Sequence, residues 1–149
     1  MKVCAFTGHR NLAGFDFDEL LLQRVVLNLV KNGVTRFLCG MAVGFDLKAA
    51  QTVIVLKQSY NIELVACLPC ANQSERYSAK NKMLYDEILA VCDEVVVLES
   101  EYKSGCMFRR DRYMVDNCDT LVCFLRKNRG GTHYTVNYAK NCNKKVIEL

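Results

Sequence analysis

The residues with the clearest capacity for chemistry are Gly130, Gly131 and Thr132, which follow the apolar run of residues 121–125. An apolar run, a paired-glycine turn and a helix-like continuation predict a strand that leads into the start of a helix. Glycines let main-chain N–H groups approach an anion, and the dipole of a helix N-terminus attracts one. The segment therefore predicts a phosphate site. The alternative is a tight turn in which Thr132 only caps the helix.

Two further glycine loops follow the apolar runs of residues 2–6 and 34–39. The candidate ligand-binding residues of these loops are Thr7, Gly8, His9, Arg10, Gly40, Met41, Gly44 and Asp46. Asp46 has two interpretations. It caps the following helix, which its position favours, or it accepts a hydrogen bond from a ribose hydroxyl or a base.

Arg109 and Arg112 lie on a helix that is predicted just before the run 121–125. Residues three apart project from one helix face, and paired guanidinium groups suit a phosphate. The alternative is a solvated cationic face that Asp111 and Asp116 neutralise. We favour the ligand interpretation because the strand and its glycine pair come next along the chain.

Gln73 follows a turn after Pro69, which is the only proline and ends the predicted strand of residues 62–68. Gln73 and Tyr77 lie one helical turn apart, so both could contact a base or a sugar. A solvated glutamine and a packed tyrosine are the alternative. We expect Gln73 to bind the ligand.

Apolar runs alternate with segments of helical spacing along the whole chain. Helices are predicted over residues of about 17–32, 47–57, 75–91 and 107–116 and from residue 133, with strands between them and a final strand at 145–149. This alternation predicts an α/β fold: a single Rossmann-like domain over residues 1–149, with a mostly parallel sheet and helices on both faces. In such sheets ligands bind at the carboxyl ends of strands, where the strand order reverses. The three glycine loops should therefore meet at one edge.

Composition narrows the class of ligand. Of the 149 residues, 51% are hydrophobic and 24% are charged, as in a globular domain with a real core. The net charge of +4 is modest, Lys and Arg are mostly scattered, and no aromatic platform is visible. We therefore expect a small phosphorylated ligand and do not expect nucleic acid as a partner.

Nine cysteines are spread over predicted strands and helices, and residues 1–6 lack the apolar stretch of a secretory signal. These features predict a reducing, cytoplasmic setting. Cys67 and Cys70 have redox-motif spacing but close an apolar strand, so we interpret them as core residues. With only His9 and His133 as histidines, neither a metal site nor a cofactor is expected. The apolar runs are too short for a membrane span.

Taken in order, the segments 7–10 and 40–46, the turn at Gln73, the arginine pair and the segment 130–132 resemble the SLOG superfamily, in particular its small stand-alone YspA and YoqJ type of bacteria and phages. The resemblance implies a Rossmann-like domain that binds a nucleotide or a nucleotide-derived ligand. LOG-type relatives are phosphoribohydrolases and commonly dimers, so the resemblance also implies a homo-oligomer. Relatives of the DNA-processing protein A type bind single-stranded DNA, and SLOG domains of defence systems sense signals made from NAD or ADP-ribose.

One departure from the LOG pattern bears on catalysis. LOG enzymes carry a second Gly-Thr and a glutamate after the glycine pair, whereas Thr132 is followed here by His133-Tyr-Thr-Val without an acid. Cleavage of a glycosidic bond needs a carboxylate, which Asp46, Asp116 or Glu99 would have to supply. We therefore expect binding without turnover, for example of an ADP-ribose or NAD derivative. A nucleoside-monophosphate phosphoribohydrolase is the alternative.

Overall fold

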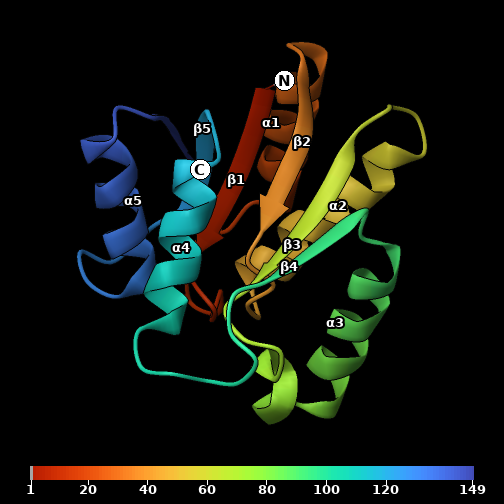
Figure 1. Cartoon of the computed structure of the whole chain (residues 1–149). Helices are drawn as coiled ribbons and strands as arrows, with labels where there is room; N and C mark the ends of the chain where they lie inside the picture. The colour runs from red at the N-terminus through yellow and green to blue at the C-terminus, as the bar shows by residue number, and fades with distance from the viewer. Residues whose placement is uncertain (1) are drawn as a thin grey trace.

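Six parallel strands form one sheet, in the order β4-β3-β2-β1-β5-β6, in the computed structural model, which describes residues 2–149 (Figure 1). The strands are β1 (Lys2–Gly8), β2 (Val34–Cys39), β3 (Glu63–Leu68), β4 (Glu94–Val97), β5 (Thr120–Phe124) and β6 (Lys145–Glu148). The helices are α1 (Glu19–Lys31), α2 (Phe45–Lys57), the 3-10 helix η1 (Gln73–Arg76), α3 (Ala79–Val91), α4 (Cys106–Asp116) and α5 (Gly131–Asn141). The predicted Rossmann-like α/β fold is confirmed.

The strand order reverses at β1, which lies between β2 and β5. The chain first builds outward from β1 to β4 and then returns through α4 to pair β5 with the other side of β1. Thr7 lies opposite Cys123, and Gly8 lies opposite Phe124, so β1 and β5 end together. The loops that leave these two strands must diverge from one point, and this is where open α/β sheets bind ligands.

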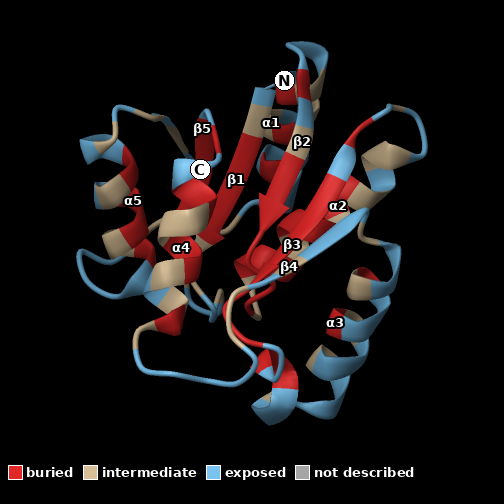
Figure 2. Cartoon of the chain, in the orientation of Figure 1, coloured by how far each residue is buried: buried red, intermediate tan, exposed pale blue. Residues whose placement is uncertain are grey.

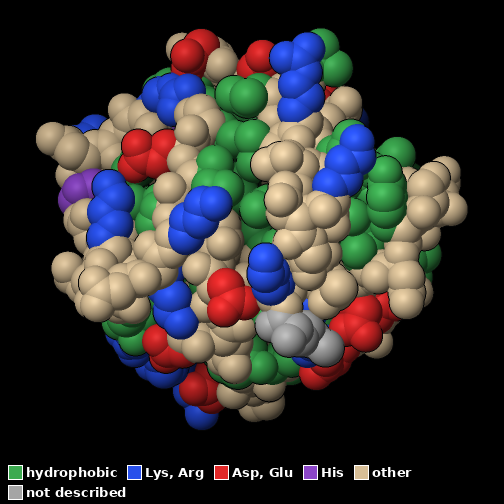
Figure 3. All heavy atoms as spheres, turned by 90° about the horizontal axis from the view of Figure 1, so that it is seen from above, with side chains coloured by type: hydrophobic (Ala, Val, Ile, Leu, Met, Phe, Trp, Pro, Cys, Tyr) green, Lys and Arg blue, Asp and Glu red, His purple; other side chains and the backbone are tan. Residues whose placement is uncertain are grey.

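Helices cover both faces of the sheet, and most of its central strands are buried (Figure 2). Phe6 packs in a core with residues of α1, α2 and α3, and its neighbour Ala5 packs in a second core with residues of α4 and α5. At the edge where the strands begin, Lys and Arg side chains are interspersed with Asp and Glu (Figure 3). The other edge, where the strands end, carries the glycine loops.

Two helix starts differ from the predicted ones. The helix predicted from Glu75 is two elements, because Tyr77 is extended and the side chain of Ser78 accepts from the N–H of Asn81 to start α3. The N-cap of α1 is Asp18, whose side chain accepts from the first turn. Asp16, which has the spacing of a capping box with Glu19 and is therefore the N-cap that the sequence predicts, instead lies 2.7 Å from Nε of Arg126.

All nine cysteines lie within the described residues, and none of them forms a disulfide. Burial raises the pKa of the Cys67 thiol to about 12 and also raises the pKa of the Cys70 thiol, so both are protonated at neutral pH. Between residues 2 and 149, none of the helices has the length and apolar character to cross a membrane.

Candidate functional site

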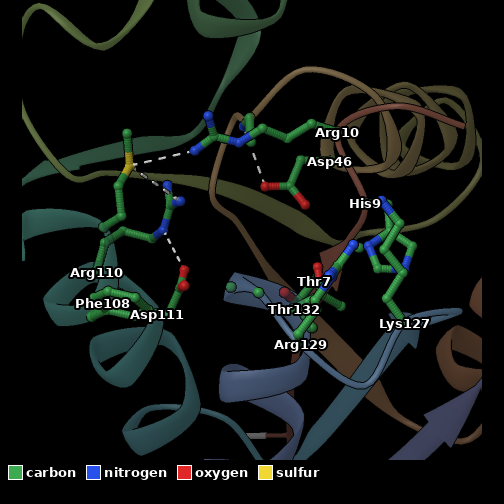
Figure 4. A pocket seen from close by; sticks show the side chains of 15 residues that line it. Thr7, His9, Arg10, Asp46, Phe108, Arg110, Asp111, Lys127, Arg129 and Thr132 are labelled. Carbon is green, nitrogen blue, oxygen red and sulfur yellow. Dashed lines mark hydrogen bonds and ion pairs between the residues drawn. The ribbon is translucent and has the colours of Figure 1, made fainter.

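A cavity of about 560 Å³ opens at the carboxyl edge of the sheet, where the loops after β1, β2 and β5 meet (Figure 4). Eight of the predicted ligand-binding residues line it: Thr7, Gly8, His9, Arg10, Asp46, Gly130, Gly131 and Thr132. Sequence reasoning missed the other lining residues: Ala42, Met107, Phe108, Arg110, Asp111, Lys127 and Arg129. The geometry thus brings the three glycine loops together around one space.

The loops after β1 and β2 fit against each other through two glycines. A Cβ on Gly8 would collide with the ring of Phe45, and a Cβ on Gly44 would collide with the carbonyl oxygen of Arg10. Gly44 also has a φ of +81°, which favours glycine. The N–H of Phe45 donates to the carbonyl oxygen of His9 at 3.1 Å. These contacts hold the first two loops in one arrangement.

His9 joins the loop after β1 to the loop after β5. Its Nε2 accepts a 2.8 Å hydrogen bond from the backbone N–H of Arg126, and its ring stacks on Phe15. Burial, followed by the positive charges of Lys127 and Arg126, lowers the pKa of His9. The imidazole is therefore neutral at physiological pH and serves as an acceptor that positions the third loop.

The start of α5 faces the cavity without a side-chain cap. The N-cap is Gly130, which has a φ of +91°. The N–H of Tyr134 donates the first hydrogen bond of the helix to the carbonyl oxygen of Gly130. Thr132 is the second helical residue and not the cap, so the predicted capping role of its hydroxyl is wrong. A Cβ on Gly130 or Gly131 would meet no atom within 4 Å. Neither packing nor a positive φ therefore requires a glycine at position 131.

Asp46 presents an oxygen that the protein leaves unsatisfied. Its Oδ2 accepts from the N–H of Ala42 at 3.2 Å, whereas its buried Oδ1 has no hydrogen-bond partner among residues 2–149. Burial raises the pKa of Asp46 to about 7, against the opposing effects of Arg110 and of the Ala42 N–H. The N-cap of α2 is Gly44, so the capping role that position favoured for Asp46 is wrong. Its carboxyl group lines the cavity instead.

A buried arginine organises the wall between these groups. Nε of Arg110 lies 2.7 Å from Oδ1 of Asp111, and its Nη1 donates to the carbonyl oxygens of Gly40 and Cys67. A Cβ on Gly40 would lie 2.8 Å from the guanidinium carbon and 2.9 Å from Oδ2 of Asp46. Glycine is thus needed at position 40 because Arg110 and Asp46 approach the backbone there.

The predicted arginine pair does not reach the cavity. Residues Arg110 and Asp111 occupy the cavity face of α4, and each residue of an α-helix is turned by about 100° from the one before. Arg109 therefore points to the preceding loop, where it donates to a backbone carbonyl at 3.2 Å. Arg112 points to α5 and donates to the phenol oxygen of Tyr134 at 2.8 Å. The cation that α4 supplies to the cavity is Arg110.

Several predicted residues support the cavity from outside its lining. Nε2 of Gln73 donates to the carbonyl oxygen of Gly40 at 2.9 Å, and the hydroxyl of Tyr77 donates to that of Met41 at 2.9 Å. Both side chains thus hold the loop after β2. Asp116, a candidate catalytic acid, accepts from Tyr138 on the surface and is not part of the cavity.

Comparison with known proteins relates the whole chain to one family. The sequence profile of the YspA SLOG family matches residues 7–148. The SPbeta prophage-derived protein YoqJ of Bacillus subtilis is 30% identical over 144 residues, which cover 88% of this chain and 84% of that protein. A UPF0398 protein of Bacillus pumilus is 29% identical over 154 residues, which cover 95% of this chain and 83% of that protein.

Two solved structures share the fold. DNA processing protein A (DprA) from Streptococcus pneumoniae has a TM-score of 0.73 at 20% identity, and DprA from Helicobacter pylori has a TM-score of 0.73 at 18% identity. Each comparison covers 99% of this chain, which spans about half of the first protein (50%) and 64% of the second.

The Helicobacter pylori protein is described by its single-stranded DNA binding mode. The expectation that excluded nucleic acid as a partner is therefore wrong, because a protein that contains the same fold binds single-stranded DNA. That expectation relied on the scattered charge and on a missing aromatic platform. The structure does contain a row of aromatic rings that starts at the cavity: Phe108 lines it and lies 4.7 Å from Tyr134, which stacks on Tyr138.

Proposed function

The chain belongs to the YspA SLOG family, as its sequence motifs predicted, and from this premise we propose that the cavity binds a nucleotide or a nucleotide-derived molecule without turnover. An ADP-ribose or NAD derivative is the example that the family resemblance suggests. One observation carries the proposal. The uncapped start of α5 and the side chain of Asp46, one oxygen of which has no hydrogen-bond partner among the described residues, belong to the lining of the same cavity. Donors for an anion and an acceptor for a hydroxyl are thus offered together.

The start of α5 suits a phosphate group. The first N–H groups of an α-helix have no partner inside the helix, and the helix dipole adds partial positive charge there. Gly131 leaves these donors open, since a Cβ at this position would project into free space. Lys127 and Arg129 line the same part of the cavity and add two cationic side chains. A phosphate that binds here would accept main-chain hydrogen bonds and meet positive charge.

Asp46 suits the sugar of the same ligand. A buried carboxylate oxygen without a partner is costly, and a ribose hydroxyl would donate the hydrogen bond that it lacks. Asp46 lies in the first turn of α2 and the glycine pair lies at the start of α5, and the cavity is lined by both. Its volume of about 560 Å³ lies within the usual range for small-molecule sites, roughly 300 to 1,000 Å³. A nucleotide carries the phosphate and the hydroxyls that the two groups require.

Isothermal titration calorimetry tests the proposal with AMP, ADP-ribose and NAD, and with adenosine as the phosphate-free control. We expect at least one phosphorylated compound to bind, and adenosine to bind at least about ten-fold more weakly, because a charge-assisted contact contributes about 1.5 to 3 kcal/mol. A Kd of about 1 mM corresponds to a binding free energy of about −4 kcal/mol. If no phosphorylated compound binds at a concentration of about 1 mM, the proposed nucleotide site is wrong.

Hydrolysis of an N-glycosidic bond is a second candidate function, favoured by the carboxyl group of Asp46. A pKa of about 7 lets this group exchange a proton near neutral pH, as a general acid or base must. Chromatography after incubation with nucleoside monophosphates tests it. Released base that disappears in Asp46→Asn would establish turnover, and intact nucleotide would leave binding as the function.

Single-stranded DNA is a further candidate ligand, favoured by an aromatic row that starts at Phe108 in the cavity lining and continues through Tyr134 to Tyr138. Aromatic rings beside cationic groups stack bases with little sequence preference. Fluorescence anisotropy with a labelled oligothymidylate measures it. Affinity that falls steeply with salt and drops in Phe108→Ala would support this ligand, whereas the absence of binding at low salt would remove it.

A further inference from the structure

A second cavity of about 700 Å³ adjoins the first at the same edge of the sheet. It lies over η1 and the start of α3, and its lining includes Asn72, Tyr77 and Tyr102. Two residues line both cavities: Arg10, from the loop after β1, and Met107, from the first turn of α4. The two spaces therefore meet at this pair of side chains.

The partition between the cavities is a weak contact. Nη2 of Arg10 lies 3.8 Å from Sδ of Met107, which Figure 4 draws as a dashed line from Arg10. A thioether sulfur is a poor acceptor, and both side chains are long and flexible. Arg10 is exposed and forms no ion pair with any carboxylate within residues 2–149. Its guanidinium group is therefore available to an anion that crosses between the cavities.

The second cavity offers groups that recognise a base or a sugar. Tyr102 is 62% exposed, so its ring is free to stack. Its backbone N–H donates to Oδ1 of Asn72 at 3.1 Å, which fixes the loop that carries the ring. The amide of Asn81 also lines this cavity. An aromatic ring with amide groups around it suits a planar, hydrogen-bonding moiety.

We propose that the two cavities form one site for a two-part ligand, in which a diphosphate joins a nucleoside to a second sugar or nucleoside. This inference rests on the proposed function. One phosphate binds at the start of α5 and the next beside Arg10, so the diphosphate crosses where the cavities meet. The first half of the ligand offers its ribose to Asp46, and the second half enters the cavity that Tyr102 borders.

Calorimetry with AMP, ADP, ADP-ribose and NAD tests this inference. We expect ADP-ribose or NAD to bind at least ten-fold more tightly than ADP, because only they reach the second cavity. Tyr102→Ala and Asn72→Ala should abolish this gain and leave the affinity for AMP unchanged. Arg10→Ala should lower the affinity for every diphosphate more than the affinity for AMP. Met83→Ala is the matched control, since Met83 is 65% exposed on α3 and lines neither cavity.

The outcomes separate this inference from the proposed function. If AMP binds and neither ADP-ribose nor NAD binds more tightly than ADP, the two-part site is wrong and the nucleotide site stands. The same conclusion follows if Tyr102→Ala lowers the affinity for AMP as much as the affinity for NAD. If none of the four compounds binds, both proposals are wrong. Circular dichroism of each variant verifies that the exposed substitutions leave the fold intact.

Discussion

The backbone N–H of Arg126 donates a 2.8 Å hydrogen bond to Nε2 of His9, a residue 117 positions earlier in the chain. The bond links the loop after β1 to the loop after β5, at the point where the strand order reverses. A nitrogen that accepts a hydrogen bond carries no proton, so the contact requires an uncharged imidazole. Protonation of His9 would break the link between the two loops that enclose the cavity.

His9 should make the free energy of unfolding depend on pH. Its folded pKa lies below the ordinary value of 6.5, so the unfolded chain takes up this proton first as the pH falls. The stabilisation is thus present above about pH 6.5 and is lost as the pH falls through the folded pKa. We expect His9→Gln to remove this loss of stability at low pH. Urea denaturation between about pH 5 and pH 7 measures the free energy of unfolding of both proteins, and the same dependence on pH in both would contradict the prediction.

Asp46 should act in the opposite direction. Its folded pKa of about 7 exceeds the ordinary 3.8, so the folded protein holds this proton more firmly and stability falls as the pH rises between these values. Asp46→Asn should therefore raise the free energy of unfolding at pH 8, by about 2 to 4 kcal/mol. The gain should vanish toward about pH 4. Denaturation curves at both pH values test this, and an equal effect at both would show that ionisation is not the cause.

Gly130 and Gly131 form a matched pair for the phosphate site. Gly131→Ala should leave stability within about 0.5 kcal/mol, because its Cβ meets no atom, but should weaken nucleotide binding about ten-fold or more. Gly130→Ala should in addition cost about 1 to 2 kcal/mol of stability, since its φ is +91°. Calorimetry and denaturation distinguish the two effects. Undiminished binding by Gly131→Ala would remove the helix start from the site.

Arg110 and Arg112 should respond differently to truncation. Arg110→Ala leaves Asp111 buried without its partner and should destabilise the fold by about 3 kcal/mol or more. Arg112→Ala removes a surface contact to Tyr134 and should leave the denaturation midpoint and the nucleotide affinity nearly unchanged. Loss of affinity in Arg112→Ala, with the fold intact, would restore the role that helical spacing first suggested.

The alternation of apolar runs and helical segments was sufficient to predict the fold and the meeting of three glycine loops at one edge. Glycines signal backbone geometry locally, and Gly8, Gly44 and Gly130 each meet a need that the structure identifies. The spacing of the arginines alone could not predict which face of α4 packs on the sheet. Arg109, Arg110 and Arg112 differ only in which face packs on the sheet, and that depends on tertiary contacts.

The unpartnered oxygen of Asp46 could not be predicted from the sequence, because it depends on every residue around the carboxyl group. A hydrogen bond from a ribose hydroxyl was one of the two interpretations of this residue. The contacts of Gln73 also depend on the tertiary structure. Its position after a strand predicted a ligand contact; in the structure its amide bonds to the carbonyl of Gly40 and to Tyr85, and the residue lines the second cavity. Lys127 and Arg129 were within reach of prediction, since cations next to a glycine pair at a helix start suit the same anion.

The most direct test of the phosphate site is an NMR titration of the isotopically labelled protein with AMP, followed through the backbone amide signals. We expect the signals of Gly130, Gly131 and Thr132 to shift along one saturating curve, and those of Gly14 and Gly33, which lie outside the cavity, to stay in place. Saturable shifts confined to α1 or α3, with the three signals at the start of α5 unmoved, would contradict it.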